Sequence, residues 1–278
     1  AVGYSLDELR SRAIVNMQHE LQTRPNFSVV TVIAGVEGAG KGETVNALHE
    51  WMDPRWLQAH AFGRPSDEEA ERPPHWRFIR LFPPKGRIGI FFGSWYTRPI
   101  LNHATDKTSD AEFTVEMQQI VAAERMHTDD GALIIKLWLH LPPDIASERV
   151  RLDHLRELTE VEMPDDDIDF LETYEKLKVV SEEAIRATDT GHSPWHLIEA
   201  TDPYYRDLTT GQIVEQCLRA RLENNGQQQD NSPPVSLADT GQPTILDTID
   251  TRAELAAEVY KHELEKYQAR LASLAWEA

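Results

Sequence analysis

A glycine-rich segment with one lysine is the clearest chemical motif of the sequence: Gly35-Val-Glu-Gly-Ala-Gly-Lys-Gly-Glu-Thr44. The preceding residues, 28–34, are rich in β-branched side chains and predict a buried strand, and residues 43–52 predict a helix. Glycines between a strand and a helix allow several backbone N–H groups to point at one anion, and the helix start and Lys41 add positive charge. The spacing fits a phosphate-binding loop; the alternative is a glycine turn with an incidental lysine. The predicted phosphate contacts within the loop are Gly35, Gly38, Gly40, Lys41, Gly42, Glu43 and Thr44.

A basic segment follows this loop in an otherwise acidic chain. The 278 residues include 47 Asp and Glu against 28 Lys and Arg, a formal net charge of −19, yet six basic residues and no acidic one occur between Arg72 and Arg98. We expect this segment to face phosphate and to form part of a lid over the loop. We assign phosphate contacts to Arg72, Arg77 and Arg80; the alternative is that these arginines pair with the acidic surface.

Lys136 is the third chemical signal, because it lies in the apolar strand pattern of residues 133–141. A buried charge requires a partner, so Lys136 predicts a bound anion or a carboxylate beside it, unless it marks an exposed edge of the strand. We include Lys136 among the phosphate contacts and leave the carboxylate open.

The elements that position these residues alternate along the chain. Strands are predicted at 28–34, 57–62, 88–92, 133–141 and 195–200. Helices are predicted at 6–23, 43–52, 111–127, 143–158, 168–187 and 207–223. This alternation predicts a three-layer α/β/α fold with a parallel, doubly wound sheet.

The composition changes near residue 224 and divides the sequence into three parts. Residues 1–222 form the predicted α/β domain, and residues 223–244 are a polar, Pro-rich linker. Residues 245–278 start a new pattern, with a helix predicted at 252–276. We therefore expect them to begin a second domain, and we expect the chain to be part of a longer protein.

Composition excludes several classes of protein. The acidic balance argues against a general nucleic-acid-binding surface. No apolar run reaches the ~20 residues that span a bilayer, and we expect no signal peptide, no membrane partner and a cytoplasmic location. One cysteine, Cys217, excludes an internal disulfide framework and a multi-thiolate metal site.

Several segments in order resemble the polyphosphate kinase 2 family over roughly residues 6–222. They are GVEGAGKGET, ERPPHWRFIR, SWYTR, IIKLWLH and TDTGHSPWHLIEATDPYYR. The resemblance implies a P-loop kinase-like fold similar to thymidylate kinase, with a helical lid. It implies phosphoryl transfer between inorganic polyphosphate and a nucleoside mono- or diphosphate (AMP, or ADP), with Mg²⁺. The sequence is similar to the N-terminal half of tandem members such as polyphosphate:AMP phosphotransferases, which implies a fused second domain and a homo-oligomer.

The sequence departs from the family at two positions that matter for chemistry. The family's aspartate two residues after the first glycine is Glu37 here, and the Asp-Arg before Ser-Trp-Tyr is Phe92-Gly93. Loss of a carboxylate removes a magnesium ligand and leaves the metal ligands unknown, and loss of the arginine removes a phosphate clamp. The predicted catalytic residues are Glu37, Lys41 and Arg98.

Three hypotheses follow. The domain itself transfers phosphate; or it is an inactive half that binds polyphosphate or supports an active second domain; or it is an ATP-dependent P-loop nucleoside kinase.

Overall fold

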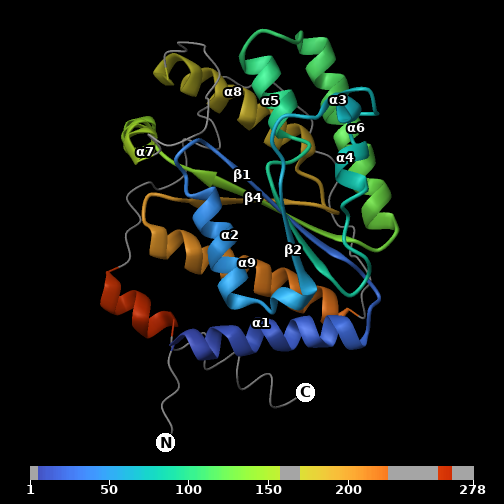
Figure 1. Cartoon of the computed structure of the whole chain (residues 1–278), viewed down its shortest axis with the longest axis vertical. Coiled ribbons are helices and arrows are strands. Elements are labelled where there is room, and N and C mark those ends of the chain that lie inside the picture. Colours follow the sequence, from blue (N-terminus) through green and yellow to red (C-terminus); the bar gives the residue numbers. More distant parts are fainter. Residues whose placement is uncertain (1–5, 157–169, 225–255, 265–278) are drawn as a thin grey trace, which may run out of the picture.

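A computed structural model describes residues 6–156, 170–224 and 256–264, and its centre is a five-stranded parallel sheet (Figure 1). The strands are β1 (Val29–Gly35), β2 (Leu57–Ala61), β3 (Ile88–Phe92), β4 (Leu133–His140) and β5 (Trp195–Glu199). Their order across the sheet is β2-β3-β1-β4-β5. All five predicted strands are confirmed, with ends that differ by at most one residue.

Strand β1 is central because it is apolar on both faces. Residues Val29, Val30, Val32 and Ile33 are fully buried, and β1 pairs with β3 on one side and β4 on the other. A strand covered on both faces gains from a continuous apolar sequence rather than an alternating one. Since all strands are parallel, their carboxyl ends meet at one edge of the sheet, where ligands bind in open α/β folds.

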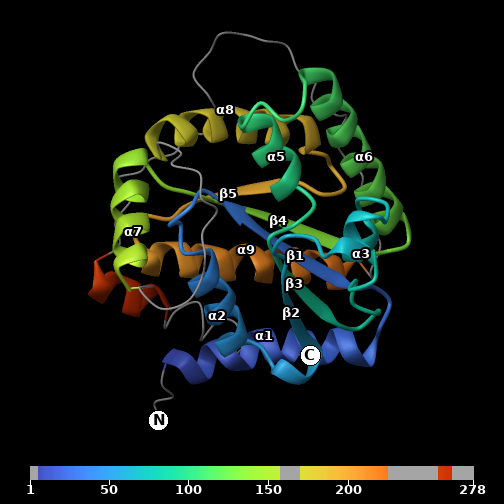
Figure 2. The ribbon, with the colours of Figure 1, turned by 45° about the horizontal axis from the view of Figure 1, so that its top comes forward.

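Helices cover both faces, which confirms the predicted three layers (Figure 2). One layer packs α1 (Leu6–Thr23), α2 (Lys41–Trp51) and α9 (Pro203–Glu223) against each other. The other packs α5 (Thr97–Ala104), α6 (Asp110–Asp129) and α8 (Phe170–Thr188), with α7 (Pro143–Arg156) in contact with α8. The short helix α3 (Asp67–Ala70) begins with three acidic residues. The sequence did not predict α5 or the short segments η1 (Pro54–Trp56) and α4 (Trp76–Ile79).

Capping explains where the helices begin. Helix α9 begins at Pro203, four residues before its predicted start, because the Asp202 carboxylate accepts hydrogen bonds from the N–H groups of Tyr204 (2.7 Å) and Tyr205 (3.1 Å). Helix α6 begins with a capping box between Ser109 and Glu112.

The predicted linker and second-domain start lie almost entirely outside the described residues. Residues 223–224 end α9, and residues 257–264, within the helix predicted at 252–276, are helical. The domain boundaries therefore stay predictions. Within the described ranges, no helix is both long and apolar enough to cross a bilayer.

Candidate functional site

The predicted phosphate loop connects the carboxyl end of β1 to the amino end of α2. Gly40 is the N-cap of α2, with left-handed backbone angles (φ 78°, ψ 31°) and no side-chain cap. The first intrahelical bond runs from the Thr44 N–H to the Gly40 carbonyl, so the earlier N–H groups of the helix have no helical acceptor. These groups, together with the helix dipole, make the loop a suitable anion site.

Lys41 lies across the loop. Its ammonium donates to the carbonyl oxygens of Gly35 (3.2 Å) and Val36 (2.9 Å) and to Oε2 of Glu37 (3.3 Å). The Glu37 side chain is 70% exposed, so this carboxylate is open to solvent. The structure thus brings together two of the three predicted catalytic residues, Glu37 and Lys41.

Two residues of the predicted loop set do not present side chains to a ligand. Thr44 is fully buried and its hydroxyl donates to the Gly40 carbonyl (2.9 Å), so this hydroxyl is engaged within the loop, and a phosphate contact of Thr44 stays a prediction. Glu43 is an exposed acid in the first turn, and its negative charge leaves only its backbone N–H suited to phosphate. At Gly42, a Cβ would have no heavy atom within 4 Å, so the loop has room for a side chain there.

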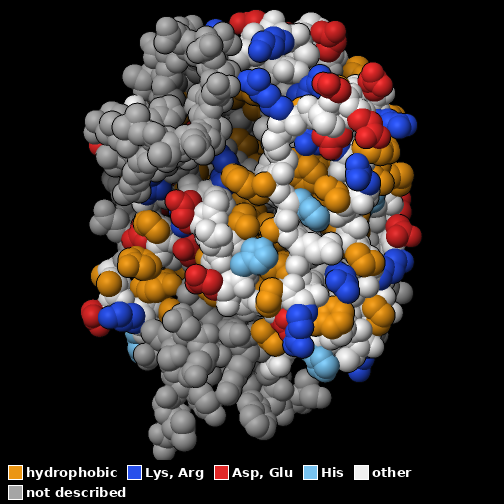
Figure 3. Space-filling model, viewed as in Figure 1, with side chains coloured by type: hydrophobic (Ala, Val, Ile, Leu, Met, Phe, Trp, Pro, Cys, Tyr) orange, Lys and Arg blue, Asp and Glu red, His pale blue; other side chains and the backbone are white. Residues whose placement is uncertain are grey.

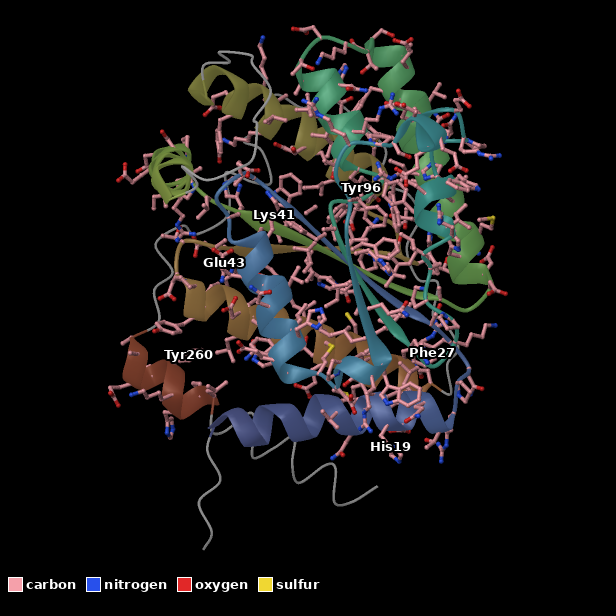
Figure 4. All side chains as sticks on the ribbon, in the orientation of Figure 1. His19, Phe27, Lys41, Glu43, Tyr96 and Tyr260 are labelled. Atoms are coloured by element: carbon pink, nitrogen blue, oxygen red, sulfur yellow. The ribbon has the colours of Figure 1, made fainter. Side chains whose placement is uncertain are left out.

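An apolar cavity of about 500 Å³ lies in front of the loop. Lys41, at the start of α2, and Tyr96, just before α5, both line it (Figure 4). Much of the remaining wall is aromatic or aliphatic and includes Phe62, Phe92, Ile100, Trp138, Tyr174 and Leu177. Phe92 therefore places an apolar ring at the position where the family resemblance implies a carboxylate.

A second cavity, of about 600 Å³, adjoins the first and carries most of the positive charge. Its cationic lining comes from Arg64, Arg72, Arg77 and Arg98, and it also contains Glu69 and Glu116. Burial raises the pKa of the Glu116 carboxyl, and the nearby Arg98 opposes that shift. Arg98, the third predicted catalytic residue, thus lies at this second cavity and not at the loop.

Two of the four arginines of this cavity, Arg72 and Arg77, already have protein partners. Arg77 donates to the Gly63 carbonyl (3.1 Å) and pairs with Glu69 (3.4 Å), and its side chain is 13% exposed. Arg72 pairs with Glu68 (3.5 Å). In Figure 3, basic side chains over α3 to α6 alternate with acidic ones on the visible face. The alternative prediction, that these arginines pair with acidic residues of the surface, therefore holds for Arg72 and Arg77.

The basic segment is not a single lid. It contains α4 and the core strand β3 before it reaches α5. Arg80 stacks over Trp76 (4.9 Å to the ring centroid). Lys85 pairs with Asp130 and Arg87 stacks over Trp56, and both basic residues lie just before the amino end of β3. Of the predicted arginine contacts, the structure brings Arg72 and Arg77 to the cavity, while Arg80 does not line it.

Lys136 does not contact the loop, and its prediction as a phosphate contact is wrong. It is fully buried and donates to Oε2 of Glu124 (2.8 Å), to the Thr188 carbonyl (2.7 Å) and to the Tyr96 hydroxyl (3.1 Å). These three contacts use the three ammonium hydrogens. Burial lowers the pKa of Lys136, and Glu124 opposes this shift. The carboxylate partner left open by the sequence is Glu124.

Glu124 is the centre of a buried network that the sequence did not reveal. Its carboxylate is 1% exposed and also accepts from the Trp95 indole (2.9 Å), the Tyr96 hydroxyl (2.5 Å) and Ser193 (2.7 Å). Burial, followed by the charge of Glu124, raises the pKa of Tyr96 well above its ordinary value. Three of the segments that carried the family resemblance therefore meet at one carboxylate from α6. The lone lysine in an apolar strand was the signal for this network.

The residues near the loop do not fit a protein-held magnesium ion. Phe92 offers no oxygen, and Glu37 is exposed and paired with Lys41. Within the described ranges, no group of three His, Cys, Asp or Glu side chains could hold a metal. Gly93 has φ 71°, and a Cβ there would lie 2.8 Å from the Phe62 carbonyl oxygen, so the backbone at this position favours glycine over the family's arginine.

Two arginines missed at the level of sequence approach the loop from other elements. Arg149 of α7 donates to the Gly38 carbonyl (3.3 Å), and the Arg206 guanidinium of α9 packs against Gly40. Arg206 belongs to the ATDPYYR segment of the resemblance, which was a usable signal, whereas no motif marked Arg149.

Comparison with known proteins gives consistent matches. The family model described as Polyphosphate kinase 2 (PPK2) matches residues 5–226. The chain is 39% identical over 290 residues to a polyphosphate:AMP phosphotransferase of Pseudomonas aeruginosa, covering 98% of this chain and 57% of that protein. It is 36% identical to the protein of the same name from Pseudomonas syringae, covering 96% of this chain and 54% of the relative. The chain thus spans little more than half the length of these relatives.

Solved structures agree with the fold. A crystal structure of a putative polyphosphate kinase 2 from Pseudomonas aeruginosa matches with a TM-score of 0.68 and 37% identity, covering 98% of this chain and 54% of that one. The polyphosphate kinase 2 structure from Arthrobacter aurescens has the same TM-score at 22% identity, covering 84% of this chain and 81% of that one, and it supports the fold alone.

Proposed function

Since this chain belongs to the polyphosphate kinase 2 family, we propose that it serves phosphoryl transfer between polyphosphate and a nucleotide, and that the described domain binds phosphate chains without completing the transfer. AMP is the favoured nucleotide because both relatives named above are polyphosphate:AMP phosphotransferases. The homo-oligomer, the second domain and the cytoplasmic location belong to the same proposal and rest on the family resemblance and the composition. Mg²⁺ enters the proposal only as the metal that the family resemblance implies for the reaction, because the residues near the loop do not fit an ion held by the protein.

One contrast within the site carries this proposal. The loop keeps its unpaired N–H groups and Lys41, which are the parts needed to hold phosphate. The end of β3 has Phe92 and Gly93, and neither supplies the charge that stabilises a transferring phosphoryl group. Binding and transfer depend on different strand ends, so one can persist without the other.

A binding assay and a turnover assay together test this proposal. In calorimetry, the purified chain should bind inorganic tripolyphosphate, and Lys41→Ala should weaken binding by at least tenfold, while Lys85→Ala, far from the loop, should leave it unchanged. With polyphosphate, Mg²⁺ and AMP, ADP formation should not exceed that of the Lys41→Ala variant. Absence of tripolyphosphate binding would refute the binding role.

Intrinsic transfer by this domain is the second candidate, and the position of Glu37 favours it. This carboxylate lies 3.3 Å from the Lys41 ammonium and is open to solvent, so it is placed to orient an acceptor. The turnover assay decides between the two: ADP formation that is lost in both Glu37→Gln and Lys41→Ala supports transfer. Replacing polyphosphate with ATP in the same assay tests the nucleoside kinase alternative.

A further inference from the structure

Two arginines from distant parts of the chain approach the phosphate loop. Arg149 lies in α7 and Arg206 in the first turn of α9, and these elements flank the amino end of α2 (Figures 1 and 2). Neither residue belongs to the loop motif, and the proposed function assigns no role to either.

Arg149 ties the tip of the loop to the segment after β5. Its Nη1 donates to the carbonyl oxygens of Gly38 (3.3 Å) and Ala200 (3.1 Å), and its Nη2 donates to the Thr201 carbonyl. The planar guanidinium can hold several acceptors in fixed directions, which an ammonium cannot do. The Gly38 oxygen is therefore held toward Ala200 and Thr201. Because Lys41 binds the Gly35 and Val36 oxygens, cations engage three carbonyls of the loop.

Arg206 fixes the other end of the loop. It is 3% exposed, and its Nε donates to Asp207 (2.9 Å). Its Nη1 lies 1.6 Å from the position that a Cβ on Gly40 would occupy. Gly40 has φ 78°, which residues with side chains rarely adopt. Arg206 therefore fills the space that only glycine leaves free, and its charge lies directly beside the N-cap of α2.

We propose that Arg149 and Arg206 are positioning residues of the phosphate loop. Arg149 holds the Gly38 carbonyl toward Ala200 and Thr201, and Arg206 supports the left-handed backbone of Gly40. The free N–H groups at the start of α2 then face one anion. The class of ligand is the phosphoanhydride chain, and this part of the inference rests on the proposed function. The effect of the two arginines on the shape of the loop does not depend on it.

Amide hydrogen exchange in the ligand-free protein tests the effect on loop shape. In Arg149→Met and Arg206→Met, exchange at the hydrogen-bonded loop amides of Val36 and Ala39 should accelerate at least tenfold, whereas exchange in β1 should be unchanged. Arg219→Met is the matched control, because Arg219 is on the same helix as Arg206 but pairs only with Glu215 in the described part of the chain. Loop exchange equal to that of the parent protein in both arginine variants would overturn the proposal. A general loss of melting temperature with equal acceleration throughout β1 would also overturn it.

Tripolyphosphate titration tests the consequence for binding. Both methionine variants should bind at least tenfold more weakly, and the lysine variants Arg149→Lys and Arg206→Lys should recover only part of the loss, because they keep charge without the planar fork. If a methionine variant does not fold, its lysine variant takes its place in both measurements. If the parent protein fails to bind, the proposed function fails while loop exchange still decides the positioning role.

A double-mutant cycle isolates the contact between Arg206 and Gly40. Gly40→Ala should lower tripolyphosphate affinity at least tenfold in the parent protein, because its Cβ displaces the guanidinium. In an Arg206→Ala background the same change should cost at least about threefold less affinity than in the parent protein, because the space is then free and only the strain of the positive φ remains. Equal losses in both backgrounds would refute a direct contact.

Discussion

The Lys136–Glu124 pair gives the sharpest stability prediction, through the substitution Lys136→Met. Methionine keeps most of the apolar stem but removes the ammonium. The two charged side chains are 0% and 1% exposed and lie 2.8 Å apart. Breaking a buried pair by removing one partner costs about 3–5 kcal/mol, because the other charge stays buried. We expect Lys136→Met to lie within this range, since Glu124 would keep three neutral donors while the Thr188 carbonyl loses its partner.

Urea unfolding followed by tryptophan fluorescence measures this loss, because Trp95 and Trp195 contact the network. For a domain of this size, the loss corresponds to a fall in Tm of roughly 6–20 °C. The variant Lys136→Met/Glu124→Gln removes both charges and should recover at least about 1 kcal/mol relative to Lys136→Met. The control Lys85→Met breaks an exposed pair with Asp130 and should cost less than about 1 kcal/mol. If Lys136→Met costs no more than this control, with or without Glu124→Gln, the reasoning from burial is wrong.

Three further changes are predicted. Gly93→Ala should lower the free energy of unfolding in urea by about 1–3 kcal/mol, because of the positive φ at Gly93 and the nearby Phe62 carbonyl. At Gly63 a Cβ meets nothing within 4 Å, so the control Gly63→Ala should change it by less than about 0.5 kcal/mol. Equal losses in the two variants would contradict this. Asp202→Ala should lose about 1 kcal/mol by removing the cap of α9, and Asp202→Asn should retain most of it. Burial lowers the pKa of His127, so the unfolded state binds its proton more readily: stability from this group is present above pH ~6.5 and is lost as pH falls through the folded pKa. The loss of unfolding free energy between pH 7 and pH 5 should therefore shrink in His127→Gln, and an unchanged loss would exclude His127 as its source.

The strands and the position of the glycine-rich loop between β1 and α2 could be predicted because their signals are local. The β-branched segment before Gly35 and the glycine spacing after it depend only on neighbouring residues, and both predictions agree with the structure. Helix α5 was missed because it has only eight residues and follows directly from Ser-Trp-Tyr, without an N-terminal side-chain cap. A short helix whose formation depends on tertiary packing leaves little periodicity in the sequence.

The partners of charged residues could not be predicted for a different reason. Lys136 requires an anion, but the sequence cannot distinguish a ligand from Glu124, twelve residues away and on another element. Arg149 donates across 111 residues to Gly38, and no local pattern records that contact. Long-range pairing is a property of the fold, so the sequence predicted which residues need a partner and not which partner they have.

The separate origins of the loop contacts and of the charges at β3 also explain how one site can keep anion binding after catalysis is lost. The loop is shaped by contacts from β1, α2, α7 and α9, through Lys41, Arg149 and Arg206. The charged groups needed for transfer would come from the end of β3, where Phe92 and Gly93 stand, and the atoms nearest to a Cβ at Gly93 would be those of Phe62. A change at β3 therefore removes charge from the transfer position without altering the carbonyls and glycines that form the anion site. The net charge of −19 does not oppose this, because the cations that matter are local and partly buried, so the nearby field is set by a few positive groups rather than by the acidic surface.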